Sequence, residues 1–593
     1  MSQAIPHLQR NAVSHQLFVK GKPFLILGAE LQNSSMTSAA YMRTVWQKLV
    51  DMHINTVLGC VCWESIEPIE GQFDFTKLDQ VIYDARSHHL HLILLWFGSF
   101  KNGLSTYVPR WVKTDYKRFP RMHIKAEDSG NSDSDSIKLQ TADVLSIFHT
   151  EAQKCDARAF GELLKHLKQV DGDHSTVIMV QVENETGLLG DSRDRSAAAN
   201  KRFAEDVSAD LLSFLEEEYD TLHEDLKENL EHFTKYIKSP VEERKSKSWE
   251  AVFGKGKHTD ELFMAYHYAK YLDQVAAAGK AEYPIPLYTN VWLNYMGKDG
   301  DNDFPAIVGG GGDPGDYPSG GGVSKVLDIW QKFAPNLDFI SPDIYLNDYV
   351  VSCRQYRHRN QPLFIPEQRR DDYGARRVWA AFGSHQALGT SPFGIDTLEV
   401  EGNPFTTTYG LLSSMSDIIL DAQRRPGSSL GFFFDELPPP PSSPDEKQRP
   451  DPSPPITATF GGYEVRIERC FVFGRPGPGA GMIIHANSDV PSEPPRFILI
   501  GYGFQAVFRS LNPKSTFTGI LEFLEKEPVK GPDGRTELRT LRRLNGDETR
   551  SGRFAMMPGF DPDYGGFPIC VTIPARTMVA EVEPYSLEEE GEL

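Results

Sequence analysis

The chain has 593 residues, of which 40% are hydrophobic, and a formal net charge of −20. This length exceeds what one hydrophobic core usually serves, so two or more domains are expected. The negative charge argues against nucleic acid or an anionic membrane as the main partner, and no apolar run reaches the length of a transmembrane span.

The first 425 residues alternate between apolar runs and amphipathic stretches. A hairpin is expected over residues 16–31, and its second arm is the first of eight apolar runs. Such alternation is typical of a (β/α)8 barrel rather than an open sheet. The other expected strands cover 55–60, 90–96, 176–182, 286–292, 337–345, 362–366 and 391–396, and the helices 38–52, 78–88, 142–170, 260–278, 324–333, 375–387 and 407–423.

Three stretches interrupt this alternation. Residues 98–139 form a long polar segment with a Ser/Asp tract at 128–136, and we expect a loop there. A helical insertion is predicted near 200–258, where the charged part, 204–247, is expected to carry solvated helices. The glycine-rich stretch 309–322 lacks the Gly-Lys-Ser/Thr ending of a phosphate-binding loop and is predicted to be a flexible loop.

The composition and the hydrophobic pattern of the chain change after residue 425. Proline, glycine and short alternating apolar runs replace the helical pattern, which predicts an all-β, sandwich-like domain over 426–593. Residues 438–455 are rich in proline and are expected to be an extended linker or surface loop.

The cysteines and the amino terminus bear on location. Six cysteines are few for this length, and their spacing offers neither a CxxC pair nor a zinc-type cluster. Cys60 and Cys62 lie two apart on one predicted strand, where a mutual disulfide has poor geometry. The first residues lack the basic and apolar regions of a signal peptide. We expect a reduced, cytoplasmic protein, with secretion by another route left open.

Acidic residues stand at the ends of two predicted strands. Strand four ends in Glu183-Asn184-Glu185, and strand seven ends at Glu367. Parallel barrel strands converge at their carboxyl-terminal mouth, so Glu185 and Glu367 are expected to face each other. Glycosidases use such a pair, with retention at about 5–5.5 Å and inversion at roughly 6.5–9.5 Å between the carboxyl groups. Each glutamate alone could instead cap a helix or form an ion pair.

The segment Gln181-Val182-Glu183-Asn184-Glu185-Thr186-Gly187 resembles the acid/base motif of retaining (β/α)8 glycosidases, and especially that of family 35 β-galactosidases. Trp63-Glu64-Ser65-Ile66-Glu67-Pro68, with Gly71-Gln72-Phe73-Asp74-Phe75, is similar to another signature of that family, shared in part with family 42. The resemblance covers residues 15–425. It implies that Glu185 is the acid/base, Glu367 the nucleophile and Asn184 a ligand of the sugar 2-hydroxyl.

The implied activity is that of a retaining exo-β-glycosidase, a β-galactosidase in the first place, that removes terminal β-galactosyl residues without metal or cofactor. Strands one, three and seven depart from the family 35 pattern, which indicates a divergent branch with a C-terminal β domain. Two alternatives remain open: the same mechanism on another β-glycoside, such as a glucoside or arabinoside, and a catalytically silent carbohydrate-binding protein. The expected partner is a carbohydrate, and homo-oligomerisation is left open.

Further sugar contacts are predicted by position at the strand ends. Each of the tryptophans among them could equally belong to the core. Glu183 and Glu185 point to the same side if the strand stays regular, and Glu183 is then expected to support Glu185 from deeper in the barrel. The predicted contacts are Glu30, Trp63, Glu64, Trp96, Lys101, Asn102, Asp343 and Tyr345.

Overall fold

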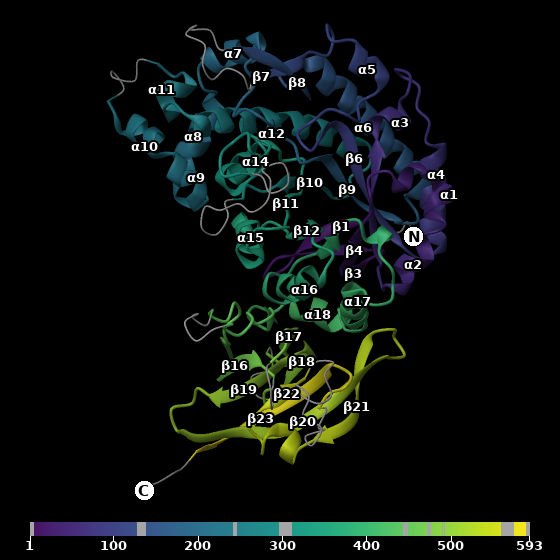
Figure 1. Ribbon diagram of the computed structural model, residues 1–593, viewed down its shortest axis with the longest axis vertical. Helices are drawn as coiled ribbons and strands as arrows, with labels where there is room; N and C mark the ends of the chain where they lie inside the picture. The colour runs from purple at the N-terminus through teal and green to yellow at the C-terminus, as the bar shows by residue number, and fades with distance from the viewer. Residues whose placement is uncertain are drawn as a thin grey trace.

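The protein is described here from a computed structural model. It covers residues 5–126, 138–240, 246–295, 311–442, 449–470, 476–488, 490, 493–558 and 574–588. Helices and parallel strands form the upper part of the molecule in Figure 1, and antiparallel sheets form the lower part.

Eight strands form one all-parallel sheet whose neighbours follow the order of the chain. The sheet closes where the amide of Ile344 donates to the carbonyl oxygen of Glu367 at 2.9 Å. The predicted (β/α)8 barrel is therefore confirmed. Its strands are β4 (Ile26–Glu30), β5 (Thr56–Cys62), β6 (His91–Lys101), β9 (Val177–Asn184), β10 (Leu287–Trp292), β11 (Phe339–Asp343), β12 (Phe364–Gln368) and β13 (Gly389–Pro392).

Helices follow each strand and cover the outside of the barrel. The predicted helix over 38–52 is two short helices, because the chain turns at Thr44 and Val45. The main helices are α1 (Ala39–Met42), α2 (Trp46–Asp51), α3 (Trp63–Ile66), α4 (Thr76–Ser87), α5 (Arg110–Thr114), α6 (Thr150–Asp171), α12 (Lys257–Glu282), α14 (Leu327–Phe333), α15 (Tyr349–Gln355), α16 (Asp372–Ser384), α17 (Pro404–Ser414) and α18 (Ser416–Ala422).

Both faces of the barrel strands are apolar, as expected for a buried parallel sheet. On β6, Ile93 and Leu95 belong to the cluster inside the barrel, whereas Leu92 and Leu94 pack in the outer layer with the helices. This alternation follows from the two-residue period of a strand.

The predicted N-terminal hairpin differs in its second arm. A three-stranded antiparallel sheet is made by β1 (His7–Arg10), β2 (His15–Val19) and β3 (Lys22–Phe24), and β4 is a separate barrel strand. Leu17 and Val19 join the cluster inside the barrel. The hairpin therefore ends at Phe24 and helps to fill the barrel interior.

Two interruptions are more ordered than the sequence predicts. In the stretch 98–139, β6 continues to Lys101, and β7 (Arg121–Lys125) pairs with β8 (Leu139–Leu145) beyond α5. The Ser/Asp tract at 128–136 lies outside the described residues. In the glycine-rich stretch, Ser319 pairs with Leu188 through reciprocal backbone hydrogen bonds of 2.8 and 3.0 Å, so its described part is packed.

The insertion near 200–258 is helical, as predicted, but its helices are not simply solvated. Phe214 and Trp249 are each 2% exposed, and their rings pack against Phe333 and Phe263 of the barrel helices. Charged residues mask this apolar face in the sequence. The helices are α7 (Ala197–Ala204), α8 (Ala209–Glu217), α9 (Glu224–Asn229), α10 (Glu231–Lys238) and α11 (Trp249–Phe253).

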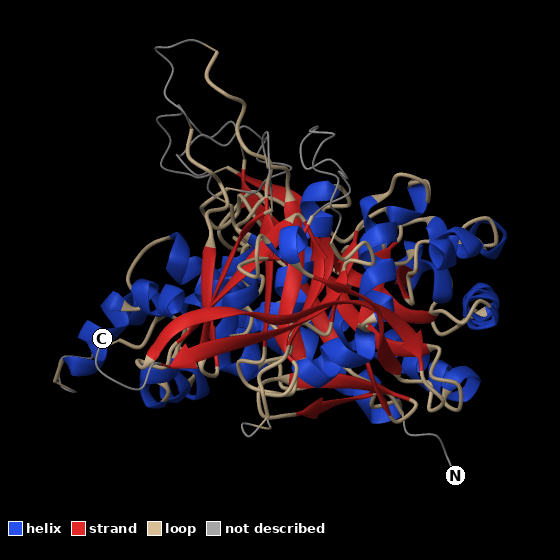
Figure 2. Ribbon diagram, turned by 90° about the horizontal axis from the view of Figure 1, so that it is seen from below, coloured by secondary structure: helices blue, strands red, loops and turns tan. Residues whose placement is uncertain are grey.

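Two antiparallel sheets form the C-terminal part and share one apolar cluster, which makes the predicted β sandwich. Figure 2 shows its long strands in front of the helices of the barrel part. One sheet contains β14 (Ser429–Phe434), β17 (Gly479–His485), β18 (Phe497–Tyr502), β23 (Val579–Glu588), β20 (Ser515–Lys530) and β21 (Thr536–Leu544), and the other β15 (Ile456–Phe460), β16 (Tyr463–Arg469), β19 (Phe504–Ser510) and β22 (Ala555–Met557).

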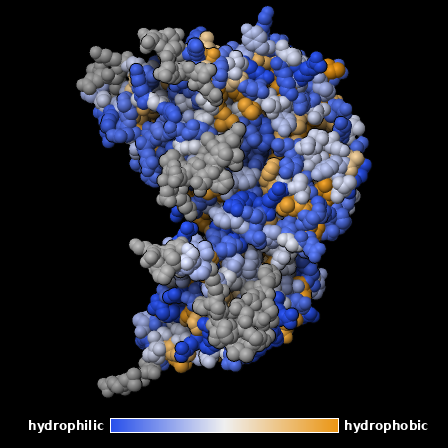
Figure 3. All heavy atoms as spheres, viewed as in Figure 1, coloured by the Kyte–Doolittle hydropathy of each residue, from blue (hydrophilic) through white to orange (hydrophobic). Residues whose placement is uncertain are grey.

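The outer surface agrees with the high net charge. The face in Figure 3 is mostly hydrophilic, with small scattered apolar groups. Among the helices that the structure describes, none combines the length and the apolar character that crossing a membrane requires.

The sandwich meets the barrel at α16. Arg377 on this helix binds Asp435, just beyond β14, through both guanidinium nitrogens, one of them at 2.6 Å from Oδ2. Gly431 lies so close to the helix that an added Cβ would be 1.8 Å from the carbonyl oxygen of Trp379. The contact between the two parts therefore requires glycine at this position.

We predict that Gly431→Ala lowers the free energy of unfolding by about 1–3 kcal/mol, because α16 and β14 must separate. Chemical denaturation followed by fluorescence measures the change. The matched control is Gly462→Ala, where an added Cβ meets no atom within 4 Å. Equal stability of the two variants would contradict the prediction.

Candidate active site

A cavity of about 300 Å³ opens at the carboxyl-terminal ends of the barrel strands. Functional sites of this fold lie at that end, because the loops after the strands meet there. Glu185 follows β9, Asp343 ends β11 and Glu367 lies in β12. The other lining residues are Asn33, Lys101, Asn102, Trp292, Leu293, Tyr345, Leu346, Asn347 and Phe393.

The three carboxyl groups of the cavity lie close together. One oxygen each from Glu185, Asp343 and Glu367 can be chosen so that all three lie within 4.8 Å of one another. Each of the three side chains is buried. Like charges at such distances in a poorly solvated place cannot all ionise without a large cost in free energy.

Three donors converge on the carboxylate of Glu367. The amide nitrogens of Asn184 and Asn290 lie 3.3 and 3.1 Å from Oε1, and the hydroxyl of Tyr345 donates to Oε2 at 2.9 Å. Donors on both oxygens suit a carboxylate that acts as an acceptor and hold it in one orientation.

Glu185 has different surroundings. Burial raises its pKa to about 7, and the negative charge of Glu367 acts in the same direction. The ammonium of Lys101 and a hydrogen bond with Asp343 partly offset this rise in pKa. Glu185 can therefore hold a proton near neutral pH, whereas its neighbour Glu367 is placed to accept hydrogen bonds.

The end of β9 is not a regular strand. Glu183 and Glu185 have φ values of 61° and 45°, a left-handed conformation that costs a non-glycine residue free energy and often occurs at functional sites. The expectation that both side chains point to one side, which assumed a regular strand, therefore fails.

Glu183 instead binds the backbone of β6 from behind the cavity. Its oxygens accept the amides of Ser99 at 3.1 Å and Phe100 at 2.7 Å, where the pairing of β6 with β9 shifts register. It also shares a hydrogen bond with Asp156 of α6, and burial raises the pKa of both carboxyl groups. Two buried carboxyl groups this close share a proton.

This buried pair shapes the segment that ends in Lys101. The Lys101 ammonium donates to Oδ1 of Asn184 at 2.9 Å, which turns the nitrogen of that amide toward Glu367. Glu183 thus acts on the cavity through β6, Lys101 and Asn184.

The structure brings most of the predicted contacts together. Lys101, Asn102, Asp343 and Tyr345 line the cavity. Glu30 is 1% exposed, and within the described part of the chain neither of its carboxylate oxygens has a hydrogen-bond partner. Its pKa is raised, first by burial and then by the charge of Glu367, so it lies in the same electrostatic environment.

Three predicted contacts lie elsewhere. Trp63 and Trp96 are fully buried, and their indole nitrogens donate to Glu67 at 2.7 Å and to Asp156 at 2.9 Å. Glu64 is half exposed and forms an ion pair with Lys113 at 2.7 Å. None of the three lines the cavity, because their side chains point to the outer layer or to solvent.

Two important residues were missed in the sequence. Asn290 binds Glu367, Asp343 and the amide of Glu185, and Trp292 lines the cavity. Both lie in the last residues of the predicted strand over 286–292, so the rule that function gathers at strand ends could have found them.

Comparison with known proteins gives two partial matches to family models. Residues 35–235 match the glycoside hydrolase family 42 model, described as Beta-galactosidase, and residues 405–556 match a domain of unknown function, DUF5597. The family 42 match covers less than half of the chain, and together with the (β/α)8 barrel it makes the chain similar to glycoside hydrolases of the β-galactosidase kind. The matching model is that of family 42. The resemblance to family 35 is therefore not confirmed by this comparison.

Solved structures of similar arrangement include β-galactosidases from Bacillus circulans sp. alkalophilus, at 16% identity and TM-score 0.41, and from Marinomonas ef1, at 15% and 0.42. The Bacillus structure covers 67% of this chain, and the Marinomonas structure covers 68%. This chain spans only 57% of the length of the first and 62% of the length of the second. The catalytic domain of a Paenibacillus polymyxa β-amylase has 11% identity and TM-score 0.43. The matched region covers 68% of this chain and 99% of the β-amylase chain. No curated protein has a significant match to the sequence.

We predict that Glu183→Ala lowers the free energy of unfolding by roughly 2–6 kcal/mol, because two buried amides lose their acceptor. Glu183→Gln should lose less, since the amide can still accept one N–H and donate to Asp156. Chemical denaturation measures both.

The control is Glu216→Ala on the exposed side of α8, for which we expect a change within about 0.5 kcal/mol. A Glu183→Ala protein as stable as this control would contradict the role given to Glu183.

Proposed function

We propose that the protein is a retaining exo-β-glycosidase that removes terminal β-galactosyl residues, with Glu367 as nucleophile and Glu185 as acid/base. The separation of these two carboxyl groups carries the proposal. Their closest oxygens lie within 4.8 Å. A closest approach within this bound fits the roughly 5–5.5 Å between the carboxyl groups of retaining enzymes, whereas inverting enzymes hold the two groups roughly 6.5–9.5 Å apart to leave room for a water.

The proposed reaction has two displacements. Glu367 attacks the anomeric carbon while protonated Glu185 gives its proton to the leaving oxygen. Glu185 then takes a proton from the water that hydrolyses the glycosyl–enzyme ester, and Glu367 leaves as a carboxylate. Opposite roles fit the opposite surroundings of the two glutamates.

Asn184 is suited to bind a substrate hydroxyl. Its amide nitrogen carries two hydrogens, and one of them points to Glu367. We assign the other to the hydroxyl beside the anomeric carbon, where a hydrogen bond that strengthens in the transition state supports catalysis. Lys101 holds the oxygen of this amide and prevents the group from flipping.

The size and lining of the cavity support action at chain ends. A volume of about 300 Å³ suits one or two sugar units, and Trp292 and Phe393 offer apolar surfaces for sugar rings. Galactose is proposed from the description of the matched family and the strand-four motif shared with family 35. A panel of nitrophenyl glycosides separates galactoside from glucoside and arabinoside.

We predict that Glu185→Gln lowers kcat on a β-galactosyl disaccharide, whose leaving sugar needs a proton, by about 10²–10⁴-fold, with a smaller loss on nitrophenyl β-galactoside, whose nitrophenolate can leave without one. Glu367→Gln should abolish turnover on both substrates. Glu64→Gln is the matched control, because Glu64 lies outside the cavity, and should keep its activity.

Proton NMR of the first product is expected to show the β-anomer. An α-anomer formed first would exclude the retaining mechanism. Calorimetric binding of the sugar without turnover by the wild type would favour the silent carbohydrate-binding alternative.

The pKa of Glu185 predicts the pH dependence. Because Glu185 must be protonated to act as an acid, kcat/KM should fall as pH rises through about 7. The charge of Lys101 lowers the pKa of Glu185, so Lys101→Met should move this basic limb to higher pH. Lys113→Met, which removes a cation outside the cavity, should leave the limb in place. A limb unmoved in Lys101→Met would contradict the assignment of Glu185.

A further inference from the structure

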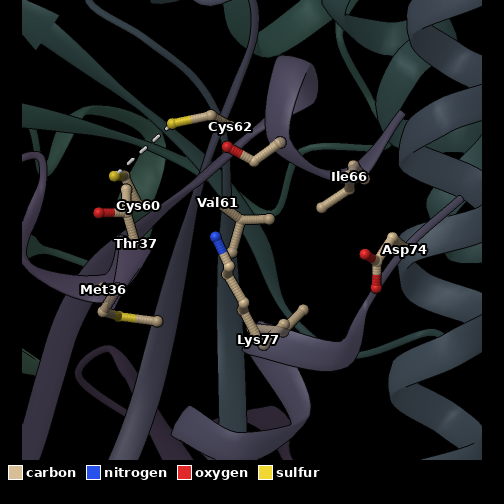
Figure 4. Close-up of a pocket in the computed structure, with 10 residues that line it drawn as sticks. Met36, Thr37, Cys60, Val61, Cys62, Ile66, Asp74 and Lys77 are labelled. Atoms are coloured by element: carbon tan, nitrogen blue, oxygen red, sulfur yellow. Dashed lines mark hydrogen bonds between the residues drawn. The ribbon is translucent and has the colours of Figure 1, made fainter. Parts of the chain in front are cut away.

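A second cavity lies beside the first and contains a pair of thiols. Cys60 and Cys62 occupy alternate positions on β5, so their side chains lie on the same face, and the two sulfur atoms are 3.9 Å apart. They line a cavity of about 170 Å³ together with Met36, Asp74 and Lys77 (Figure 4). Among the described residues, the other cysteines stand singly.

The two sulfurs are placed so that a single atom X could bond to both of them with a bent S–X–S angle. A bond from a thiolate to a soft ion is about 2.3 Å long, so one atom can reach two sulfurs that are 3.9 Å apart only with a bent S–X–S angle. Trivalent arsenic makes such bent bonds, and an arsenic with one organic substituent needs only two sulfurs. No third sulfur, histidine or carboxylate among the described residues joins this pair in a metal-type cluster.

The charges around the pair favour reaction with a soft electrophile. The hydrogen bond from Cys62 and the ammonium of Lys101 lower the pKa of Cys60, while the pKa of Cys62 is raised by its hydrogen bond to Cys60. The thiol of Cys60 therefore ionises more readily than that of Cys62, and the thiolate is the nucleophilic form. Lys77 extends its amine into the same cavity, as Figure 4 shows.

The thiol pair is also linked to the first cavity. The thiol of Cys60 donates a hydrogen bond to the carbonyl oxygen of Asn33, and Asn33 lines the cavity of Glu185 and Glu367. The short helix η1 (Ser35–Thr37) follows at once and supplies Met36 and Thr37 to the second cavity. A group bound to both sulfurs would remove this contact and displace the segment that separates the two cavities.

We propose that Cys60 and Cys62 form a dithiol site that binds monosubstituted trivalent arsenicals and that occupation of this site inactivates the enzyme. With an arsenous oxide, two As–S bonds form, the As–O bonds break, and the two thiol protons leave with the oxygen as water. Arsenic stays trivalent and neither sulfur is oxidised. The binding stands apart from the proposed function, whereas the inactivation rests on it.

Phenylarsine oxide is the probe, and intact-protein mass spectrometry is the first measurement. The wild type should take up one phenylarsenic group, which a dithiol such as dimercaptopropanol removes and glutathione does not. Alkylation of Cys60 and Cys62 should be blocked in the arsenical-treated wild type, which tests the site without any variant. Cys60→Ser and Cys62→Ser should each lose the stable adduct, and Cys353→Ser, which changes a single buried thiol, should keep it.

Hydrolysis of nitrophenyl β-galactoside is the second measurement. The adduct should reduce wild-type activity at least tenfold, and Cys62→Ser should keep its activity in the presence of the probe. Absence of an adduct on the wild type, or an equal adduct on both serine variants, would overturn the site. A full adduct with unchanged activity would contradict the proposed inactivation but not the dithiol site itself. If no preparation hydrolyses any glycoside, the proposed function fails while the mass measurement still decides the site.

Discussion

The central constraint in this molecule is the close approach of three buried carboxyl groups. Glu185, Asp343 and Glu367 come from three different barrel strands, and each would be better solvated if it moved away. The closed hydrogen-bonded sheet prevents that movement, because the strands that carry these residues are joined to their neighbours on both sides. Lys101 is the one cationic side chain among the described residues of the cavity, and it meets part of this charge. The shifted pKa of Glu185 follows from this geometry.

The distorted end of β9 turns Glu183 away from the cavity, whereas Glu185 lines the cavity. Had β9 stayed regular, Glu183 and Glu185 would both have faced the barrel interior and added a further carboxylate to the cavity. The left-handed conformations at both residues turn Glu183 toward Ser99 and Phe100 of β6. The free-energy cost of those conformations is balanced by hydrogen bonds that order the segment before Lys101. The strained backbone at the end of β9 thus allows the hydrogen bonds that order the segment before Lys101.

The two faces of one strand serve the barrel in different ways. On β5, Val57 and Val61 join the outer layer with the helices, while Leu58, Cys60 and Cys62 belong to the inner cluster. The thiols therefore lie next to the segment that walls the first cavity, even though the two cavities share no lining residue. The C-terminal sandwich, in contrast, meets the barrel through α16, by Arg377 and Asp435.

The sequence alone determined the architecture and the pair of glutamates that meet at the cavity. Strand and helix periods follow from local spacing, so the eight-fold alternation predicted the barrel, and the rule about strand ends placed Glu185 near Glu367. Only the tertiary structure decided which side chains face inward. Trp63 and Glu64 follow β5, and Trp96 ends the predicted strand over 90–96, much as Lys101 and Asp343 end β6 and β11, but the direction of a side chain depends on twist, bulges and register. The same holds for Glu183, whose turn toward β6 comes from a backbone distortion that no spacing of residues records.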